Sequence, residues 1–314
     1  MVPDEERELV LALARRLREV VLPELGSHAG RVHAPGGGGD VNFAIDAAAE
    51  EELARFVAAN APELAVFSEA AGLVEPPAGA EAVLVVDPID GTRPALAGLE
   101  AACVSVALAR MDGGRPTMRD VVAGCVVEIK SGAHFVARRG GGLESSTPVS
   151  LSANEDLDRL FWTYGLRGRP VRPYAEVLGD LIDRSSAGGG CFELGSACFD
   201  MTRVLTGQLD AYVEPGPRLV DEVPGMRAEF ERVGRGSVLN NTPYDLAAAT
   251  LCLTEGGAHV SDAAGRPLDD RPLLGADADH QISVVASSNE RLHAQLLEEV
   301  ERGLARLRDA PGRA

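Results

Sequence analysis

Hydrophobic positions along the chain follow a helical period at first and then become short, nearly continuous runs. Apolar residues at helical spacing predict a helix over 4–25, and an alanine-rich stretch predicts a second helix over 46–60. Apolar runs bounded by turn residues predict strands at 64–67, 82–86, 103–110 and 121–138. After about residue 150 the two kinds of element alternate. The predicted helices there are 174–184, 196–206, 245–256 and 290–308, and the predicted strands are 159–163, 210–213, 258–261 and 282–286.

This order of elements predicts an α+β fold in which sheets and helices form layers. The strand-rich part would be an N-terminal subdomain, residues 1–149, and the alternating part a C-terminal subdomain, residues 150–314. A chain of 314 residues is long enough for two closely packed subdomains. Residues 215–243 interrupt the alternation with turn residues, and we interpret them as an irregular segment.

Charge and cysteine content narrow the classes of partner and compartment. The formal net charge is −18 without a basic run, which disfavours nucleic acid and anionic membranes as partners. The sequence shows no apolar stretch of membrane-spanning length and no signal-peptide pattern at its start. Its five cysteines form no Cys-x-x-Cys pair and are interpreted as small buried hydrophobes. We therefore expect a cytoplasmic protein.

The most informative segment is the acidic turn that follows the predicted strand at 82–86. Asp87 and Asp90 lie three residues apart, with Pro88 fixing the backbone between them. Gly91 lets the backbone bend close to a ligand, and Thr92 can cap a following helix. Two carboxylates on one tight turn suit Mg²⁺, which binds a few protein carboxylates together with substrate phosphate.

The string Asp87-Pro88-Ile89-Asp90-Gly91-Thr92 resembles the motif of the inositol monophosphatase superfamily. Further segments in the family's order extend the resemblance over nearly the whole chain. They are Phe67-Ser68-Glu69, Glu193-Leu194-Gly195-Ser196-Ala197, Leu209-Asp210-Ala211-Tyr212-Val213-Glu214, Tyr244-Asp245-Leu246-Ala247-Ala248 and Glu255-Gly256-Gly257. The resemblance implies a layered α-β-α-β-α sandwich, the sugar phosphatase fold, and a homodimer.

The resemblance also implies the metal ligands, which are Glu69, Asp87, Asp90, Asp245 and the carbonyl group of Ile89. Two or three Mg²⁺ ions would bind there, and Mn²⁺ could substitute. Taken alone, Asp245 could equally be the N-cap of the helix that it precedes.

Catalytic and substrate-binding roles follow from the same resemblance. Thr92, Asp46 and Glu69 would be the catalytic residues, with Asp46 accepting the hydroxyl proton of Thr92 so that Thr92 orients the attacking water. The substrate would be bound by Gly91, Thr92, Gly195, Ser196, Ala197 and Glu214. We expect Glu214 to accept hydrogen bonds from sugar or cyclitol hydroxyl groups.

The chain departs from the family pattern chiefly at residues 215–243, where the family has only a handful of residues. We interpret this stretch as an insertion that borders the leaving-group pocket and can be shortened without unfolding the protein. Its arginines could supply positive charge for a second phosphate or for an acidic substrate; they are Arg218, Arg227, Arg232 and Arg235. The predicted function is a Mg²⁺-dependent phosphatase of a small sugar, cyclitol or related phosphate monoester. The alternatives are a protein-binding regulator of the same fold and a structural metal-binding protein.

Overall fold

Two large mixed sheets organise the computed structural model, which describes residues 3–27, 33–35, 41–111 and 114–309. The seven-stranded sheet has the order β4-β3-β5-β6-β7-β8-β9. Its strands are β3 (Ala65–Ser68), β4 (Gly72–Leu73), β5 (Ala82–Asp90), β6 (Cys103–Arg110), β7 (Val121–Glu128), β8 (His134–Arg138) and β9 (Gly142–Ser145). All neighbours in it are antiparallel except β3 and β5.

The five-stranded sheet has the order β11-β10-β12-β14-β13. Its strands are β10 (Phe161–Tyr164), β11 (Gly190–Phe192), β12 (Ala211–Glu214), β13 (His259–Ser261) and β14 (Val284–Ser287). Strand β10 runs parallel to β11 and β12, so the carboxyl ends of these three strands lie at one edge. A separate pair consists of β1 (His33–Pro35) and β2 (Val41–Phe43).

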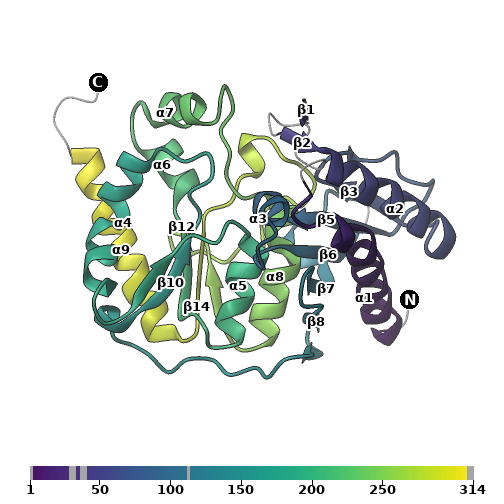
Figure 1. The fold of residues 1–314 in the computed structure, drawn as a ribbon, viewed down its shortest axis with the longest axis horizontal. Coiled ribbons are helices and arrows are strands. Elements are labelled where there is room, and N and C mark those ends of the chain that lie inside the picture. Colours follow the sequence, from purple (N-terminus) through teal and green to yellow (C-terminus); the bar gives the residue numbers. More distant parts are fainter. Residues whose placement is uncertain (1–2, 28–32, 36–40, 112–113, 310–314) are drawn as a thin grey trace.

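Helices fill the spaces between and outside the sheets (Figure 1). Helices α1 (Pro3–Val21) and α2 (Ala44–Asn60) cover the outer face of the seven-stranded sheet, and α4 (Val171–Ser185) and α9 (Glu290–Asp309) cover the five-stranded sheet. Helices α5 (Ala197–Leu205) and α8 (Pro243–Glu255) lie between the two sheets. The result is the predicted five-layer α-β-α-β-α sandwich.

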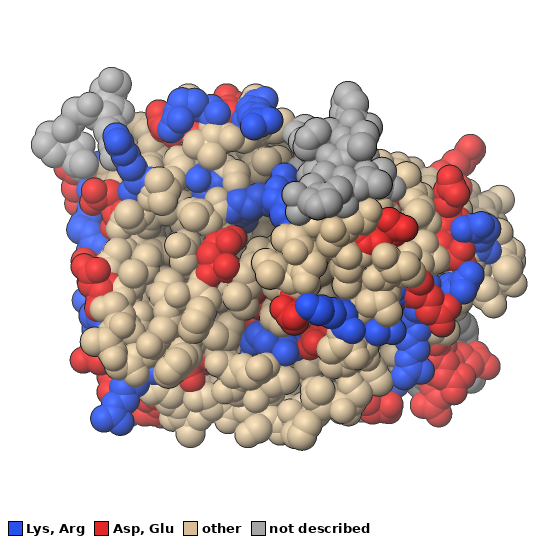
Figure 2. Space-filling model, viewed as in Figure 1, with Lys and Arg blue, Asp and Glu red and all other residues tan. Residues whose placement is uncertain are grey.

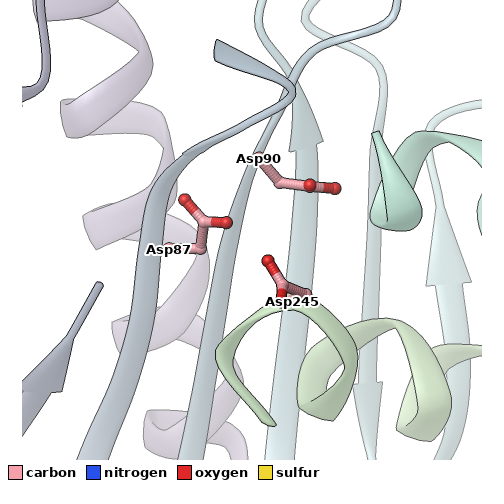
Figure 3. Close-up of side chains that lie close together, drawn as sticks. All are labelled: Asp87, Asp90 and Asp245. Atoms are coloured by element: carbon pink, nitrogen blue, oxygen red, sulfur yellow. The ribbon is translucent and has the colours of Figure 1, made fainter. Parts of the chain in front are cut away.

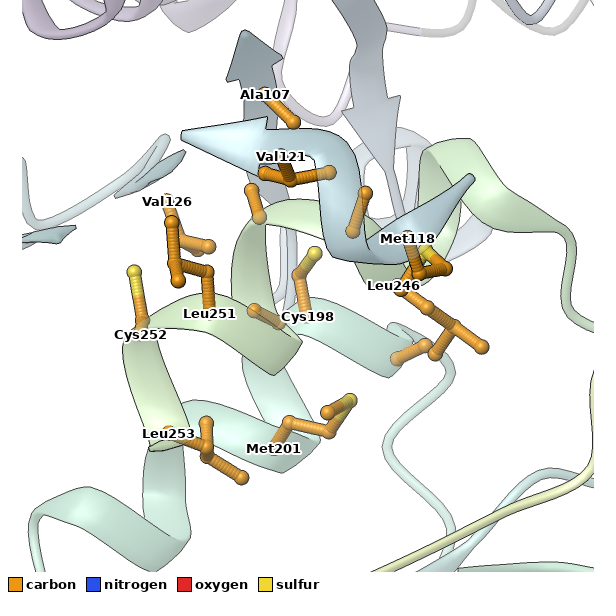
Figure 4. Close-up of a cluster of buried hydrophobic side chains, with 14 of the residues drawn as sticks. Ala107, Met118, Val121, Val126, Cys198, Met201, Leu246, Leu251, Cys252 and Leu253 are labelled. Atoms are coloured by element: carbon orange, nitrogen blue, oxygen red, sulfur yellow. The ribbon is translucent and has the colours of Figure 1, made fainter. Parts of the chain in front are cut away.

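The middle layer is held by an apolar core that α5 and α8 share with both sheets. Figure 4 shows Cys198 and Met201 from α5 beside Leu246 and Leu251 from α8. Helix α8 approaches β7 closely at Gly124, where a Cβ atom would lie 3.0 Å from the Ala248 backbone. This packing fixes the start of α8 against the seven-stranded sheet, which positions the first turn of that helix.

All the helices and strands predicted after residue 150 are present, and their ends differ from the predicted ones by about three residues or less. The strands divide between the two sheets near residue 150, although α5 and α8 pack on both. The division into two subdomains stays a prediction. In the part of the chain that the structure describes, no helix combines the length and apolarity needed to cross a bilayer.

The segment 215–243 is not irregular as predicted. It contains α6 (Gly216–Glu222) and α7 (Met226–Val233), which lie at the top of Figure 1. Leu219 and Phe230 are completely buried in the core beneath α4 and α9. Removing the segment would open that core, so we no longer expect a shortened chain to fold.

Charged side chains are mixed over the face of the molecule seen in Figure 2, where acidic and basic groups lie interspersed among uncharged residues. Many of the arginines form ion pairs with neighbouring carboxylates, as in the exposed pair of Arg184 with Asp158 at 2.8 Å. The formal net charge of −18 is therefore not gathered into one acidic area on this face.

Candidate active site

Three carboxylates from distant parts of the chain meet where the seven-stranded sheet faces α8. Asp87 and Asp90 come from the end of β5, and Asp245 comes from the first turn of α8 (Figure 3). Each offers an oxygen atom, and these oxygens all lie within 4.8 Å of one another. The structure thus brings together three of the four carboxylates predicted as metal ligands.

Strand β5 turns its last residues toward this cluster through an irregularity in its pairing with β6, between Asp87 and Asp90. The Ile89 amide donates to Asp87 Oδ1 at 2.9 Å, and the Thr92 hydroxyl donates to the Ile89 carbonyl at 3.1 Å. Gly91 has φ +89°, and a Cβ atom there would lie 2.5 Å from the Ala101 carbonyl oxygen. Only glycine fits this turn, which the sequence indicated.

Asp90 is held by the amino end of α5. It accepts hydrogen bonds from Ser196 Oγ at 2.7 Å and from the amides of Cys198 at 2.5 Å and Ala197 at 3.3 Å. Ser196 is also the N-cap of α5, since its Oγ accepts from the Phe199 amide at 3.2 Å. The Gly-Ser-Ala loop, predicted to bind substrate, therefore orients Asp90. A direct contact between the loop and substrate stays a prediction.

Asp245 caps α8 in another way than its sequence suggested, and its role as a metal ligand stays a prediction. It is the N3 residue of α8 in a capping box, in which Oδ2 accepts from the Thr242 amide at 2.6 Å and the Thr242 hydroxyl at 2.9 Å. The N-cap itself is Thr242. Because both capping bonds use Oδ2, capping leaves the carboxylate in the acidic cluster with its orientation fixed.

Burial and mutual repulsion make these acids hard to ionise. Burial, and then the charges of neighbouring acids, raise the pKa of Asp87 well above its usual value and that of Asp90 to about 7. The pKa of Asp245 is raised by burial, against the hydrogen bonds from Thr242. A hard divalent cation would relieve this repulsion, and the all-oxygen donor set fits Mg²⁺ or Mn²⁺.

Glu69 and Asp46 lie beside the cluster. Glu69 follows β3 and lines the same cleft as Asp90 and Asp245. Burial raises the pKa of Glu69 well above its usual value, and the charges of Asp245 and Asp46 raise it further. Glu69 is thus placed near the three clustered acids, as a fourth ligand would be. In this structure the Thr92 hydroxyl donates to the Ile89 carbonyl instead, so the pairing of Asp46 with Thr92 stays a prediction.

The cleft wall opposite the acids contains residues that sequence reasoning did not assign. The loop after β10 contributes Arg167 and Arg169, α5 contributes Asp200, and β12 contributes Tyr212. The end of the 215–243 segment also lines the cleft, with Val238, Leu239, Asn240, Asn241 and Thr242. Polar residues at the carboxyl ends of neighbouring parallel strands were the available signal, because ligands bind at that edge of α/β sheets.

Glu214 lies behind this wall rather than in the cleft. It is completely buried and forms an ion pair with Arg169 Nη2 at 2.6 Å. Its other oxygen accepts from the Tyr174 hydroxyl and, at 2.8 Å, from the Gly216 amide. The predicted contact with substrate hydroxyl groups is therefore wrong for Glu214, which instead holds Arg169 in place.

The arginines of the 215–243 segment do not supply the positive charge of the cleft. Arg218 binds Glu222 at 2.6 Å and Glu301 at 2.7 Å, away from the acidic cluster. Arg232 pairs with Glu229 on the exposed side of α7. Cationic side chains in the cleft come instead from Arg93, which follows Thr92, and from the loop after β10.

Comparison with known proteins decides which family has this site. The model of the inositol monophosphatase family matches residues 3–305. The chain belongs to the inositol monophosphatase family. The match spans the seven-stranded sheet, the five-stranded sheet and every carboxylate of the cluster. The resemblance carried by the acidic turn is thereby confirmed.

Individual relatives are distant in sequence but similar in length. The chain is 26% identical to the fructose-1,6-bisphosphatase/inositol-1-monophosphatase of Methanothermobacter thermautotrophicus, over 93% of this chain and 95% of that protein. It is 25% identical to the Nus factor SuhB of Xylella fastidiosa, over 80% and 78% of the two chains. The solved structure of the extragenic suppressor protein suhB from Bartonella henselae covers 94% of this chain and 98% of its own, with TM-score 0.71 and 21% identity. That likeness confirms the fold.

Proposed function

We propose that this protein is a Mg²⁺-dependent phosphatase that hydrolyses a small phosphate monoester. The observation that carries the proposal is the cluster of the buried Asp87 and Asp90 with the partly buried Asp245, whose oxygens lie within 4.8 Å of one another along a cleft. Asp87 and Asp90 are buried, and the charges of neighbouring acids raise their pKa values, so the cluster is costly without a cation. This cluster and the family membership together favour metal-assisted hydrolysis over a structural role.

Each acid has a part in this proposal. Asp87, Asp90, Asp245 and Glu69 would hold the divalent cations, and the hydrogen bonds from α5 and Thr242 keep two of these carboxylates oriented. When bound, Mg²⁺ supplies an activated water and stabilises charge on the phosphate and the leaving oxygen. Thr92 lines the cleft beside Asp90, where its hydroxyl can position the attacking water.

The alcohol part of the substrate would lie against the wall opposite the acids. This wall contains Arg167. Burial lowers the pKa of Arg167, and so does the charge of Arg169, whereas the charge of Asp245 favours the cationic form. Guanidinium groups opposite carboxylates suit a phosphate ester whose anionic oxygens face both metal and protein. A relative with 26% identity is named as both a fructose-1,6-bisphosphatase and an inositol-1-monophosphatase, so sugar and cyclitol phosphates are the first candidates.

Phosphate release is the direct test of this proposal. We expect the purified protein to release inorganic phosphate from at least one sugar or cyclitol phosphate in the presence of Mg²⁺. Mn²⁺ should support turnover, and excess chelator should abolish it, because the donor set is oxygen only. Turnover that persists in chelator, or no turnover over a broad panel of esters, would contradict the proposal.

Thr92 and Asp46 should affect the chemical step more than binding. If they act together on the attacking water, Thr92→Ala and Asp46→Asn should each lower kcat by about 100-fold or more with a small change in KM. The double variant should lose little beyond either single change, since two residues of one unit are not additive. Additive losses would show that Asp46 only stabilises the start of α2.

A second candidate is a protein-binding regulator, because one relative is named as a Nus factor. The retained acids and their orienting hydrogen bonds favour catalysis as the primary function. The two can be separated with the Asp90→Asn variant. A regulatory role that survives in the catalytically inactive variant would be independent of the acidic cluster.

A further inference from the structure

Two polar groups in the cleft have hydrogen-bonding capacity that the protein does not use. Asp200 projects from α5 and Tyr212 from β12; both line the cleft, and each is only 1% exposed. Asp200 Oδ2 accepts from the Thr163 hydroxyl at 3.1 Å. In the part of the chain that the structure describes, Asp200 Oδ1 is buried without a hydrogen-bond partner.

The Tyr212 hydroxyl complements Asp200. Its oxygen accepts from Asn241 Nδ2 at 2.8 Å, which leaves its own proton for donation. Burial raises the pKa of Tyr212 well above its usual value, so the phenol keeps this proton at neutral pH. The cleft thus contains an acceptor and a donor, both shielded from bulk water.

Other carboxyl groups nearby are already engaged. Glu214 is bound to Arg169, and Asp90 accepts three hydrogen bonds from the start of α5. A buried polar atom without a partner is costly, and a bound ligand or water can offset that cost.

We propose that Asp200 and Tyr212 bind one hydroxyl group of the alcohol part of the substrate. The hydroxyl donates to Asp200 Oδ1 and accepts from the Tyr212 O–H, which matches the donor and acceptor that every alcohol group carries. A protonated Asp200 would serve equally, because a hydroxyl can exchange the two roles. This inference rests on the proposed phosphatase function and narrows its substrates to phosphates of polyols.

The test compares a polyol phosphate with an ester that has no hydroxyl group. We would measure kcat/KM for myo-inositol 1-phosphate, fructose 1,6-bisphosphate and phenyl phosphate in the wild type, Asp200→Asn and Tyr212→Phe. We expect either substitution to lower kcat/KM for the better polyol phosphate by about 10- to 100-fold, the loss typical of a hydrogen bond in a buried site. Phenyl phosphate should change by less than about threefold, which is within the variation between functionally neutral variants.

Asp210→Asn is the matched control. Asp210 is also a buried acid, but it binds Asn154 at 2.9 Å and the Phe161 amide at 2.8 Å and does not line the cleft. Whatever its stability, the ratio of polyol to phenyl phosphate turnover in this control should match that of the wild type. Thermal unfolding of each variant checks that it is folded.

Several outcomes would overturn the inference. An unchanged ratio of polyol to phenyl phosphate kcat/KM in both variants would mean that Asp200 and Tyr212 bind only water. A wild type that prefers phenyl phosphate would lead to the same conclusion. Calorimetric binding of myo-inositol 1-phosphate and fructose 1,6-bisphosphate with Mg²⁺ gives a readout that needs no turnover. If the wild type binds neither more tightly than Asp200→Asn and Tyr212→Phe do, the inference fails. Absence of all turnover with this binding difference intact would instead contradict the phosphatase function alone.

Discussion

Replacing Asp90 by asparagine is expected to lower kcat for phosphate-ester hydrolysis on the order of 1,000-fold. Asp90 contributes one oxygen to the carboxylate cluster and lies between Asp87 and the amino end of α5. Asparagine keeps the shape of the side chain but removes the negative charge that a divalent cation needs. Steady-state phosphate release over a range of Mg²⁺ concentrations would measure the loss.

The pH dependence of stability gives an independent check on Asp90. In chelator, the pKa of Asp90 is about 7 in the folded protein, raised from 3.8 by burial and by the charge of Asp245. The folded state then binds more protons than the unfolded state between about pH 4 and pH 7, so stability falls as pH rises through this range. Asparagine does not titrate, so the melting temperature of the variant should fall less over the same range.

Mg²⁺ should reverse this loss in the wild type, because it binds the ionised carboxylates of the folded state only. The Mg²⁺-induced rise in melting temperature should therefore grow from pH 5 to pH 8 in the wild type and be much smaller in Asp90→Asn. Asp262→Asn is the matched control, since Asp262 is equally buried but binds Arg266 at 2.8 Å on another part of the surface. Equal Mg²⁺ effects in the wild type and Asp90→Asn would remove Asp90 from the metal site.

Arg169→Ala should be the most destabilising change in the cleft wall, by about 3–5 kcal/mol in the free energy of unfolding. Arg169 joins Glu214 at 2.6 Å and Asn241 at 3.2 Å, and it donates to the Arg167 carbonyl at 2.6 Å. Without it, the completely buried Glu214 carboxylate would lose its cationic partner. Urea denaturation followed by circular dichroism would measure the change.

The double variant Arg169→Met/Glu214→Gln tests whether the loss of stability in Arg169→Ala comes from the unpaired charge of Glu214. Removing both charges should restore part of the stability that Arg169→Ala loses, because no unpaired charge remains buried. Arg232→Ala is the control for losing an arginine, since Arg232 pairs with Glu229 on the surface and should change stability by only about 0.5 kcal/mol. If Arg169→Ala costs no more than Arg232→Ala, the pair does not hold the wall.

Local sequence was sufficient to predict most of the elements and the acidic turn. Helices such as α9 and strands such as β5 are recorded in the spacing of apolar residues, which depends on neighbours along the chain. The turn at Asp87–Thr92 needs glycine at Gly91, whose φ of +89° is a backbone conformation that other residues rarely adopt. Apolar spacing and turn conformation depend on residues close together along the chain, so both can be predicted from the sequence.

The function of single polar residues depends on contacts with residues that are distant in the sequence. Glu214 looks like an exposed strand end, but Arg169, 45 positions earlier, and Tyr174 from α4 enclose it. The helices within 215–243 were missed because they have few apolar residues. Leu219 and Phe230 stabilise these helices by packing into a core that distant elements supply.

The sequence by itself therefore determined the layered α+β architecture and the acids of the candidate metal site. Tertiary structure decided which carboxyl groups face the cleft, because that depends on which partners neutralise or bury each one. Asp200 and Glu214 show the difference: both are buried acids near the cleft, but only Glu214 meets a guanidinium group. Burial and pairing are properties of residues brought together by folding, and spacing along the chain does not encode them.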